Sequence, residues 1–323
     1  MQDWLIITII AVSVLCVAIV ITYIACYVLI KRAFGGRSQA RHEEVDPSKD
    51  VALMGDNYVE LYYYGRKHAI EFAQFKRERF TVTTDDGLTL VGYYIKSPNP
   101  QAKHTLIAAH GFRGSPEGDF GSLCKFFIQH FNVMYINHRS HNESEGENID
   151  FSKKAYLDMP KWVEKAQEFN PDGDIVLHGV SMGGAIVCQA SMLDLGDKVK
   201  FIVSDCAFSD AYEQLGHMVK YYKFPRFPFK MLTGLAFRHT TGINPKTIRP
   251  IDAVKKSKYP ILFVHGIQDR FVPFSMGEEL YSACASEKDC VWVQGAGHGG
   301  SFFTGMAEYQ QKYLEFIDKY CTK

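Results

Sequence analysis

The chain has 323 residues, a length that suits one large domain or two small ones. Hydrophobic residues make up 46% of it and charged residues 22%, which is ordinary for a globular protein. Lysine plus arginine equal aspartate plus glutamate at 36 each, and no long basic run is present, so nothing in the composition favours binding to nucleic acid.

The first feature along the chain is an uncharged, largely apolar stretch at residues 4–30. About 20 apolar residues cross a bilayer, and a signal peptide would have a basic start and a shorter apolar core. We therefore predict a single-pass anchor in the cell membrane at residues 1–32. Four basic residues follow the span: Lys31, Arg32, Arg37 and Arg41. By the positive-inside rule, they predict that the remainder of the chain is cytoplasmic.

Residues 33–75 separate this anchor from the main body. The first part, residues 33–50, is polar and contains two glycines and a proline, which is typical of a linker. Residues 51–75 mix apolar and polar positions and are predicted to be partly helical. We expect them to cover part of the main domain or its membrane-facing side.

The body, residues 76–323, begins with a predicted hairpin, in which strands 79–83 and 88–95 flank the turn Asp85-Asp86-Gly87. Six short apolar runs then predict buried strands: residues 105–109, 133–136, 175–177, 201–203, 261–264 and 290–293. Segments with helical spacing lie between most of them, and Pro160 is expected to start or kink one such helix. This alternation predicts an α/β fold, a mostly parallel sheet with helices on both faces.

Residues 209–251 interrupt the alternation. About forty residues separate two predicted strands here, which is long for such a connection. The stretch is rich in aromatic residues, and Pro225 and Pro228 divide it into two short predicted helices. We interpret it as a lid over the carboxyl edge of the sheet, with an inner face that forms an acyl-binding pocket. The alternative is a helix pair that only caps the core.

The pentapeptide Gly179-Val180-Ser181-Met182-Gly183 follows an apolar strand and opens a helix of small residues. This is the context of a G-x-S-x-G nucleophile elbow, a sharp turn that lifts the serine hydroxyl off the end of the sheet. The pattern alone arises often by chance. It predicts a nucleophile only if an acid, a histidine and an oxyanion site accompany it.

A serine hydroxyl needs a histidine to remove its proton and an acid to orient that histidine. Asp269 follows strand 261–264 and His298 follows strand 290–293, beyond the carboxyl ends where ligands bind in open α/β sheets. The backbone N–H groups of Met182 and Phe112, the latter in the glycine-containing loop after strand 105–109, are the predicted oxyanion donors. Asp205, which follows another strand, remains open as an alternative acid.

With these motifs, the region from about 79 to 320 resembles an α/β-hydrolase. It is similar in particular to membrane-anchored bacterial hydrolases of the serine-aminopeptidase-like and dienelactone-hydrolase-like group. The segments that carry the resemblance are His110-Gly111-Phe112, residues 138–146, residues 179–184, Ser204-Asp205-Cys206, residues 265–269 and Gly297-His298. Asn137-His138 and His141-Asn142 depart from the commoner family form, a difference that changes the predicted wall of the pocket but removes no triad member.

Three histidines and the cysteines have structural interpretations. His138 and His141 have metal-like spacing, but no carboxylate or cysteine cluster accompanies them, so we expect hydrogen-bonded roles. His110 is expected to brace the oxyanion loop. The eight cysteines form no Cys-x-x-Cys pair, which favours scattered reduced thiols. The expected site therefore uses no metal and no cofactor.

The sequence thus predicts a serine hydrolase that cleaves an ester, thioester or amide through an acyl-enzyme on Ser181. The aromatic lid and the anchor favour an esterase- or lipase-like activity on a hydrophobic, lipid-like acyl substrate. A serine peptidase of the aminopeptidase type is one alternative. A catalytically idle domain that tethers a partner at the membrane is another, and the intact set of motifs argues against it.

Overall fold

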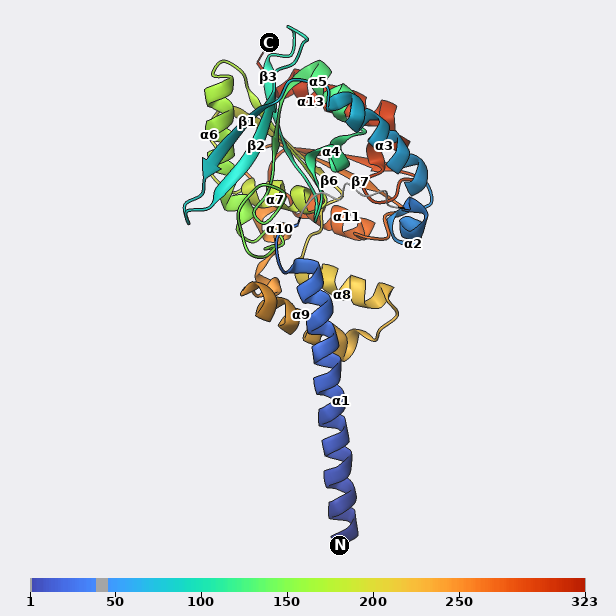
Figure 1. The fold of residues 1–323 in the computed structure, drawn as a ribbon. Helices are drawn as coiled ribbons and strands as arrows, with labels where there is room; N and C mark the ends of the chain where they lie inside the picture. The colour runs from blue at the N-terminus through green and yellow to red at the C-terminus, as the bar shows by residue number, and fades with distance from the viewer. Residues whose placement is uncertain (1, 39–45, 323) are drawn as a thin grey trace.

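The structure is a computed structural model that describes residues 2–38 and 46–322. Met1, Lys323 and part of the expected linker, Arg41 included, lie outside the described residues. Helix α1 (Gln2–Phe34) projects from a mixed α/β body, with the N-terminus at its far end (Figure 1). Its segment Asp3–Phe34 is long and apolar enough to cross a membrane. The helix continues two residues beyond the predicted boundary at residue 32, because no glycine or proline stands before Gly35.

The body contains one eight-stranded sheet with the order β1-β2-β4-β3-β5-β6-β7-β8. The strands are β1 (Glu78–Thr83), β2 (Thr89–Ile95), β3 (His104–Ala109), β4 (Phe131–Ile136), β5 (Ile175–Val180), β6 (Val199–Asp205), β7 (Ile261–Gly266) and β8 (Lys288–Val293). β2 pairs antiparallel with β1 and β4, and every other pairing is parallel. The predicted hairpin, the six further strands and the mostly parallel sheet are therefore confirmed.

Helices cover both faces of the sheet, and the strands are buried between them. Alternate residues of β3 enter different cores: Leu106 belongs to one hydrophobic cluster and Ile107 to the other. One face packs against α6 (Met159–Phe169), α7 (Met182–Ala190) and α11 (Phe274–Ala283). The other packs against α4 (Pro116–Phe120), α5 (Cys124–His130), α12 (Ser301–Thr304) and α13 (Met306–Tyr320). Pro160 starts α6, after the short helix η2 (Ala155–Asp158), and introduces no kink.

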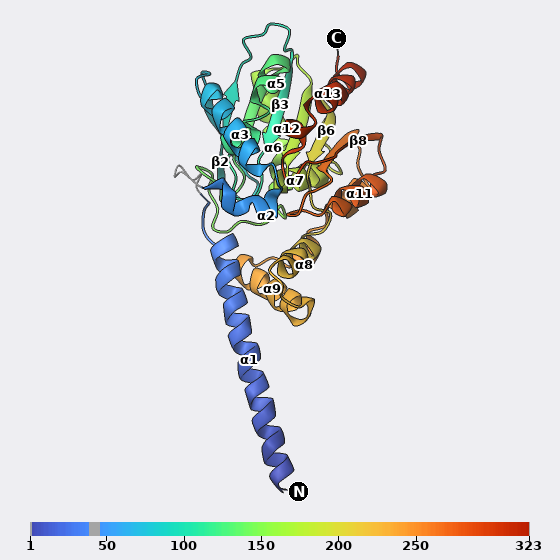
Figure 2. The same ribbon diagram turned by 90° about the vertical axis from the view of Figure 1, so that its right-hand side faces the viewer.

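Two segments outside this framework lie near the carboxyl edge of the sheet. Residues 51–75 form α2 (Val51–Met54) and α3 (Tyr58–Phe72), as the partly helical prediction suggested, and the short helix η1 (Pro47–Asp50) precedes them at the end of the predicted linker. The long insertion forms α8 (Ala211–Tyr221) and α9 (Arg226–Thr241), followed by η3 (Pro245–Thr247) and α10 (Pro250–Val254). In both views α8 and α9 lie beside α1, on the side of the body from which α1 projects (Figures 1 and 2).

Candidate active site

Ser181 lies in the sharp turn between β5 and α7. Its backbone has φ 57° and ψ −115°, a conformation that residues other than glycine rarely adopt. The two elements approach so closely that a Cβ on Gly179 would lie 2.1 Å from the Gly183 carbonyl oxygen. The Ser181 N–H donates to the Asp205 carbonyl oxygen of β6 at 2.8 Å, which fixes the strained turn to the neighbouring strand. The turn therefore presents the serine at the carboxyl edge of the sheet.

The structure brings Ser181, His298 and Asp269 together in one hydrogen-bonded chain. His298 Nε2 lies 2.9 Å from Ser181 Oγ, and His298 Nδ1 lies 2.7 Å from Asp269 Oδ2. All three residues are at least nine-tenths buried. Asp269 Oδ1 accepts the Phe271 and Val272 N–H groups at 2.9 and 2.8 Å. These bonds fix the orientation of the Asp269 carboxylate, so that Oδ2 points at the imidazole of His298.

Burial and neighbouring charge shift the pKa values of Asp269 and His298 in opposite directions. Burial alone would raise the pKa of the Asp269 carboxyl, but the His298 and His265 rings beside it lower that pKa to about 2. Burial alone would lower the pKa of His298, but the Asp269 carboxylate raises it well above its usual range. Asp269 is therefore ionised, and it makes His298 a stronger base.

Loop 110–114 passes close to the serine. A Cβ on Gly111 would lie 3.3 Å from Ser181 Cβ, and the Gly111 N–H donates to Asp119 Oδ2 at 2.7 Å. Within the part of the chain that the structure describes, the Phe112 and Met182 N–H groups are donors in no hydrogen bond to protein. Both predicted oxyanion donors are thus available to a ligand.

The alternative acid, Asp205, has other partners. Its Oδ2 accepts the Tyr309 hydroxyl at 3.1 Å, and its Oδ1 has no hydrogen-bond partner among the described residues. Burial raises the pKa of this carboxyl to about 6. The imidazole of His298 bonds to Asp269 instead, so this geometry favours Asp269 as the orienting acid.

Comparison with known proteins supports the fold. A family model described as the alpha/beta hydrolase fold matches residues 104–241. The uncharacterized protein YqkD of Bacillus subtilis is 24% identical over 249 residues, which cover 76% of this chain and 81% of YqkD. The structure of the Pyrococcus furiosus esterase Pf2001 aligns with a TM-score of 0.63 at 19% identity, over 78% of this chain and 94% of the esterase. This chain has the α/β-hydrolase fold.

A second solved α/β-hydrolase is similar over part of its length. The Pyrococcus horikoshii acylaminoacyl peptidase aligns with a TM-score of 0.56 at 20% identity, over 77% of this chain and 42% of the peptidase. At such identities the two solved structures establish the fold of this protein and nothing finer. Its chemistry must be argued from its own residues.

Three buried histidines support loop 110–114. His110 Nδ1 lies 2.8 Å from the Gly111 carbonyl oxygen, and His110 Nε2 accepts the His138 N–H at 3.2 Å. His141 Nε2 accepts the Arg113 N–H at 3.2 Å, and its Nδ1 lies 2.9 Å from the Arg139 carbonyl oxygen. Burial lowers the pKa of all three, to about 3 for His138 and about 4 for His141. They are neutral hydrogen-bonding groups that shape the loop.

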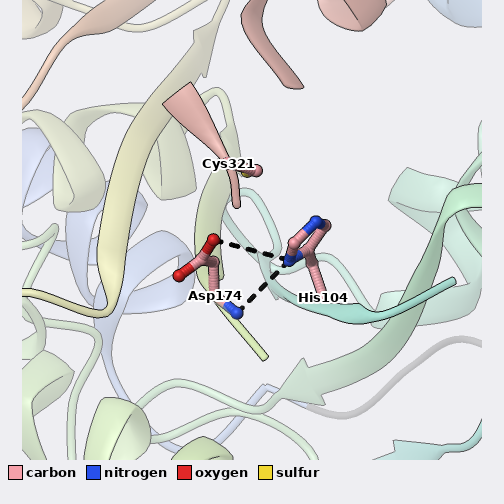
Figure 3. A group of neighbouring side chains, drawn as sticks. All are labelled: His104, Asp174 and Cys321. Carbon is pink, nitrogen blue, oxygen red and sulfur yellow. Dashed lines mark hydrogen bonds and ion pairs between the residues drawn. The ribbon is translucent and has the colours of Figure 1, made fainter. Parts of the chain in front are cut away.

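Two clusters of the described residues carry metal-ligating atom types. One consists of Cys206, Asp269 and His298, at the site already described. The other, His104, Asp174 and Cys321, lies at the amino-terminal edge of the sheet (Figure 3). There the Asp174 carboxylate accepts the Thr322 N–H and hydroxyl at 2.6 and 2.7 Å, and the Asp174 N–H donates to His104 Nδ1 at 3.3 Å. These bonds tie the C-terminal segment to the sheet and already engage Asp174 Oδ2 and His104 Nδ1.

Contacts from the N-terminal segments are the part of the site that the sequence analysis missed. The Met54 carbonyl oxygen, at the end of α2, accepts the His298 N–H at 2.6 Å. The ring of Phe34, at the end of α1, lies 4.9 Å from that of Phe112. Arg113 donates from Nε to the Ala33 carbonyl oxygen at 2.7 Å, which satisfies part of the helix C-terminus. The apolar pattern of α1 is explained by a membrane span alone, so the sequence carried no separate signal for the contact of Phe34.

Proposed function

We propose that this protein is a serine hydrolase that cleaves an acyl ester, thioester or amide through an acyl-enzyme on Ser181. The observation that carries the proposal is the position of His298, 2.9 Å from Ser181 Oγ and 2.7 Å from the Asp269 carboxylate. This is the mutual geometry that a nucleophile, a base and an orienting acid require.

In the proposed reaction Ser181 Oγ attacks the acyl carbonyl carbon while its proton passes to His298 Nε2. The negative oxygen of the tetrahedral intermediate accepts hydrogen bonds from the Phe112 and Met182 N–H groups. The carbon–leaving-group bond then breaks, and the leaving group takes the proton from His298. A water molecule attacks the acyl-enzyme in the same way, with His298 as its base, which releases the acid and restores Ser181.

The surroundings of the site favour a hydrophobic acyl group. Four aromatic rings, from Phe34, Phe112, Phe151 and Phe237, pack together beside the proposed oxyanion loop, with centroid distances of 4.9 to 6.3 Å. Such a wall suits an alkyl or aryl chain better than a polar one. An esterase- or lipase-like activity is therefore the leading proposal. A peptidase activity is the second candidate, because one structural neighbour is named as an acylaminoacyl peptidase.

We also propose that α1 anchors the enzyme in the cell membrane with the body in the cytoplasm. The helix carries Asp3 in its first turn and Lys31 and Arg32 in its last turn, and Arg37 follows. This asymmetry supports a cytoplasmic C-terminal side.

Labelling with a fluorophosphonate probe tests the reaction class. The wild-type protein should be labelled covalently, and Ser181→Ala should not, because the probe reacts only with an activated serine hydroxyl. Ser191→Ala is a matched control, since this buried serine donates to the Cys188 carbonyl oxygen away from the triad. A folded wild-type protein that stays unlabelled would contradict the proposal. A chain-length series of nitrophenyl acyl esters beside aminoacyl anilides then separates esterase from peptidase activity.

A further inference from the structure

The segment α8–α9 exposes large apolar side chains to an unusual degree. Outside α1, nine large apolar side chains of the described residues are exposed, and five of them belong to this segment. They are Tyr222, Phe224, Phe227, Met231 and Leu235. Phe227 is 77% exposed, although an aromatic ring of this size normally buries most of its area. We call these five residues, with the basic residues between and beside them, the aromatic–basic surface.

The same segment has a strong positive charge that the neutral total conceals. Residues 211–249 contain seven lysines and arginines but only one acidic residue, Glu213. Glu213 is already paired with Arg226 and Lys230. Residues 222–227 comprise three aromatic residues, two basic residues and Pro225, and all six are exposed. Aromatic rings interleaved with lysine and arginine are typical of protein surfaces that enter the headgroup region of anionic bilayers.

The position of this segment is fixed by α1. Thr233 Oγ1 of α9 lies 3.9 Å from Cys26 Sγ, and the ring of Phe237 lies 4.9 Å from that of Phe34. The Tyr23 hydroxyl bonds to His239. Helix α9 therefore packs along the part of α1 that is nearest the body, as both ribbon views show (Figures 1 and 2).

The length of α1 then places the bilayer surface at the level of α9. Tyr23 is the first residue along α1 with a bond to α9, so residues 2–22 extend beyond that contact. At 1.5 Å per residue, these residues span about 31 Å. The hydrocarbon core of a bilayer is about 30 Å thick. If residues 2–22 fill that core, then α9 lies at its boundary.

We infer that the aromatic–basic surface rests in the headgroup region of the bilayer that α1 crosses, and that anionic lipid is its binding partner. The exposed rings enter the boundary between headgroups and acyl chains, while the lysines and arginines contact the anionic headgroups. This inference extends the proposed function to its substrate class, an acyl compound dissolved in the same bilayer, and that extension depends on the proposed function.

Packed aromatic rings lie between helix α9 and the nucleophile. Phe237 of α9 contacts Phe34, and Phe34 contacts Phe112, each with ring centroids 4.9 Å apart. The loop that carries Phe112 approaches Ser181, since a Cβ on Gly111 would lie 3.3 Å from Ser181 Cβ. These packed rings form a continuous apolar contact from α9 to the loop beside Ser181, along which an acyl chain would have to insert.

Tryptophan quenching by brominated lipid tests the contact without using catalysis. The test variant is the full-length protein with two substitutions: Trp4→Phe removes the tryptophan of the span, and Phe227→Trp places one on the aromatic–basic surface. It is reconstituted in vesicles of phosphatidylglycerol and phosphatidylcholine. The matched control carries Leu314→Trp on α13, at the end of the body away from the N-terminus of α1 (Figure 1). Bromine on the upper acyl chain should remove most of the emission added by Phe227→Trp and none of that added by Leu314→Trp. If bromine left the emission of both variants unchanged, the inference would be overturned.

Two further comparisons separate lipid charge and catalysis. In vesicles of phosphatidylcholine alone, the quenching of the Phe227→Trp protein should weaken, and unchanged quenching would overturn the anionic preference.

The variant Phe227→Glu/Met231→Glu should hydrolyse a long-chain ester dissolved in vesicles about tenfold more slowly, equivalent to about 1.4 kcal/mol, with an unchanged rate on a soluble short-chain ester. Equal loss on both esters would overturn the substrate class. A wild-type protein that hydrolyses neither ester would contradict the proposed function and leave the quenching result standing.

Discussion

At the scale of single residues, the charge of Asp269 decides how His298 can act. The imidazole is buried, which alone would make it a weak base. The ionised carboxylate 2.7 Å away reverses this and raises the pKa of His298 above its usual range. His265 lies 3.3 Å from the same carboxylate and helps to lower the pKa of Asp269 to about 2. The acid therefore stays ionised throughout the range in which the histidine titrates.

The pH dependence of hydrolysis follows from this arrangement. Only the neutral imidazole can accept the Ser181 proton, so activity should rise as pH increases through the pKa of His298. Because Asp269 raises that pKa, the midpoint should lie above about 6.5, the ordinary value for histidine. Rates of ester hydrolysis measured from pH 4 to 10 give the midpoint.

Asp269→Asn should move the acidic limb to lower pH, because it removes the charge that raises the pKa of His298. It should also reduce kcat by on the order of 10³–10⁴, as loss of the orienting acid does in serine hydrolases. Asp205→Asn is the matched control: its carboxylate bonds to Tyr309, so both the limb and kcat should change little. If Asp205→Asn alone abolished turnover, Asp269 would not be the acid.

At the scale of elements, the short helix α2 completes the loop that carries His298. A Cβ on Gly297 would lie 2.0 Å from the Met54 carbonyl oxygen, so only glycine permits the 2.6 Å bond from the His298 N–H to that oxygen. Asn57 Nδ2 donates to Thr304 Oγ1 at 2.7 Å and attaches the segment to α12. The N-terminal segment is thus a structural support of the candidate base.

Gly297→Ala should displace either α2 or the His298 loop. We expect kcat/KM for a soluble ester to fall by about tenfold or more, equivalent to about 1.4 kcal/mol of transition-state stabilisation. Gly300→Ala is a matched control in the same loop, because its Cβ would meet no atom closer than 3.4 Å. Circular dichroism checks that both variants fold. A wild-type rate for Gly297→Ala would show that α2 does not position the histidine.

The strands and the elbow were predictable because their signals are local. Apolar runs, the Asp-Gly turn and the glycines around Ser181 determine their conformation through neighbouring residues. The bond from His298 to Met54 was not predictable, because it uses a backbone carbonyl and joins segments far apart in the chain. The packing of Phe34 on Phe112 was hidden for the same reason, since the apolar pattern of α1 is explained by a membrane span alone. The positive charge of residues 211–249 could have been counted from the sequence, but the zero net charge of the whole chain concealed it.

At the scale of the whole molecule, α1 has two parts with different neighbours. The side chains of residues 4–21 are exposed, whereas those of Cys26, Ile30 and Phe34 are buried against the body. Arg113 donates from Nε and Nη2 to the Ala33 and Arg32 carbonyl oxygens at 2.7 and 2.8 Å. The second part is therefore a component of the α/β body, and only the first part is free to act as an anchor.

Truncation should separate these two parts. A chain without residues 2–22 keeps the contacts of Phe34 and should hydrolyse a soluble ester in detergent at close to the full-length rate. A chain without residues 2–37 exposes Phe112 and Phe237, and should lose about 3 kcal/mol or more of stability, as removal of a buried phenylalanine does. Its Tm should fall by roughly 10 °C, and its kcat should fall because the oxyanion loop loses its support.

Phe34→Ala in the full-length chain tests the same contact without removing the helix. Phe34 is 5% exposed and its ring lies within 5.2 Å of the rings of Phe112, Phe151 and Phe237. Its loss should lower both Tm and kcat, whereas Val14→Ala, in the exposed part of α1, should leave both unchanged in detergent. If the chain without residues 2–37 matched the full-length protein in Tm and kcat, α1 would be an anchor alone, and the packing of Phe34 on Phe112 would not support the loop beside Ser181.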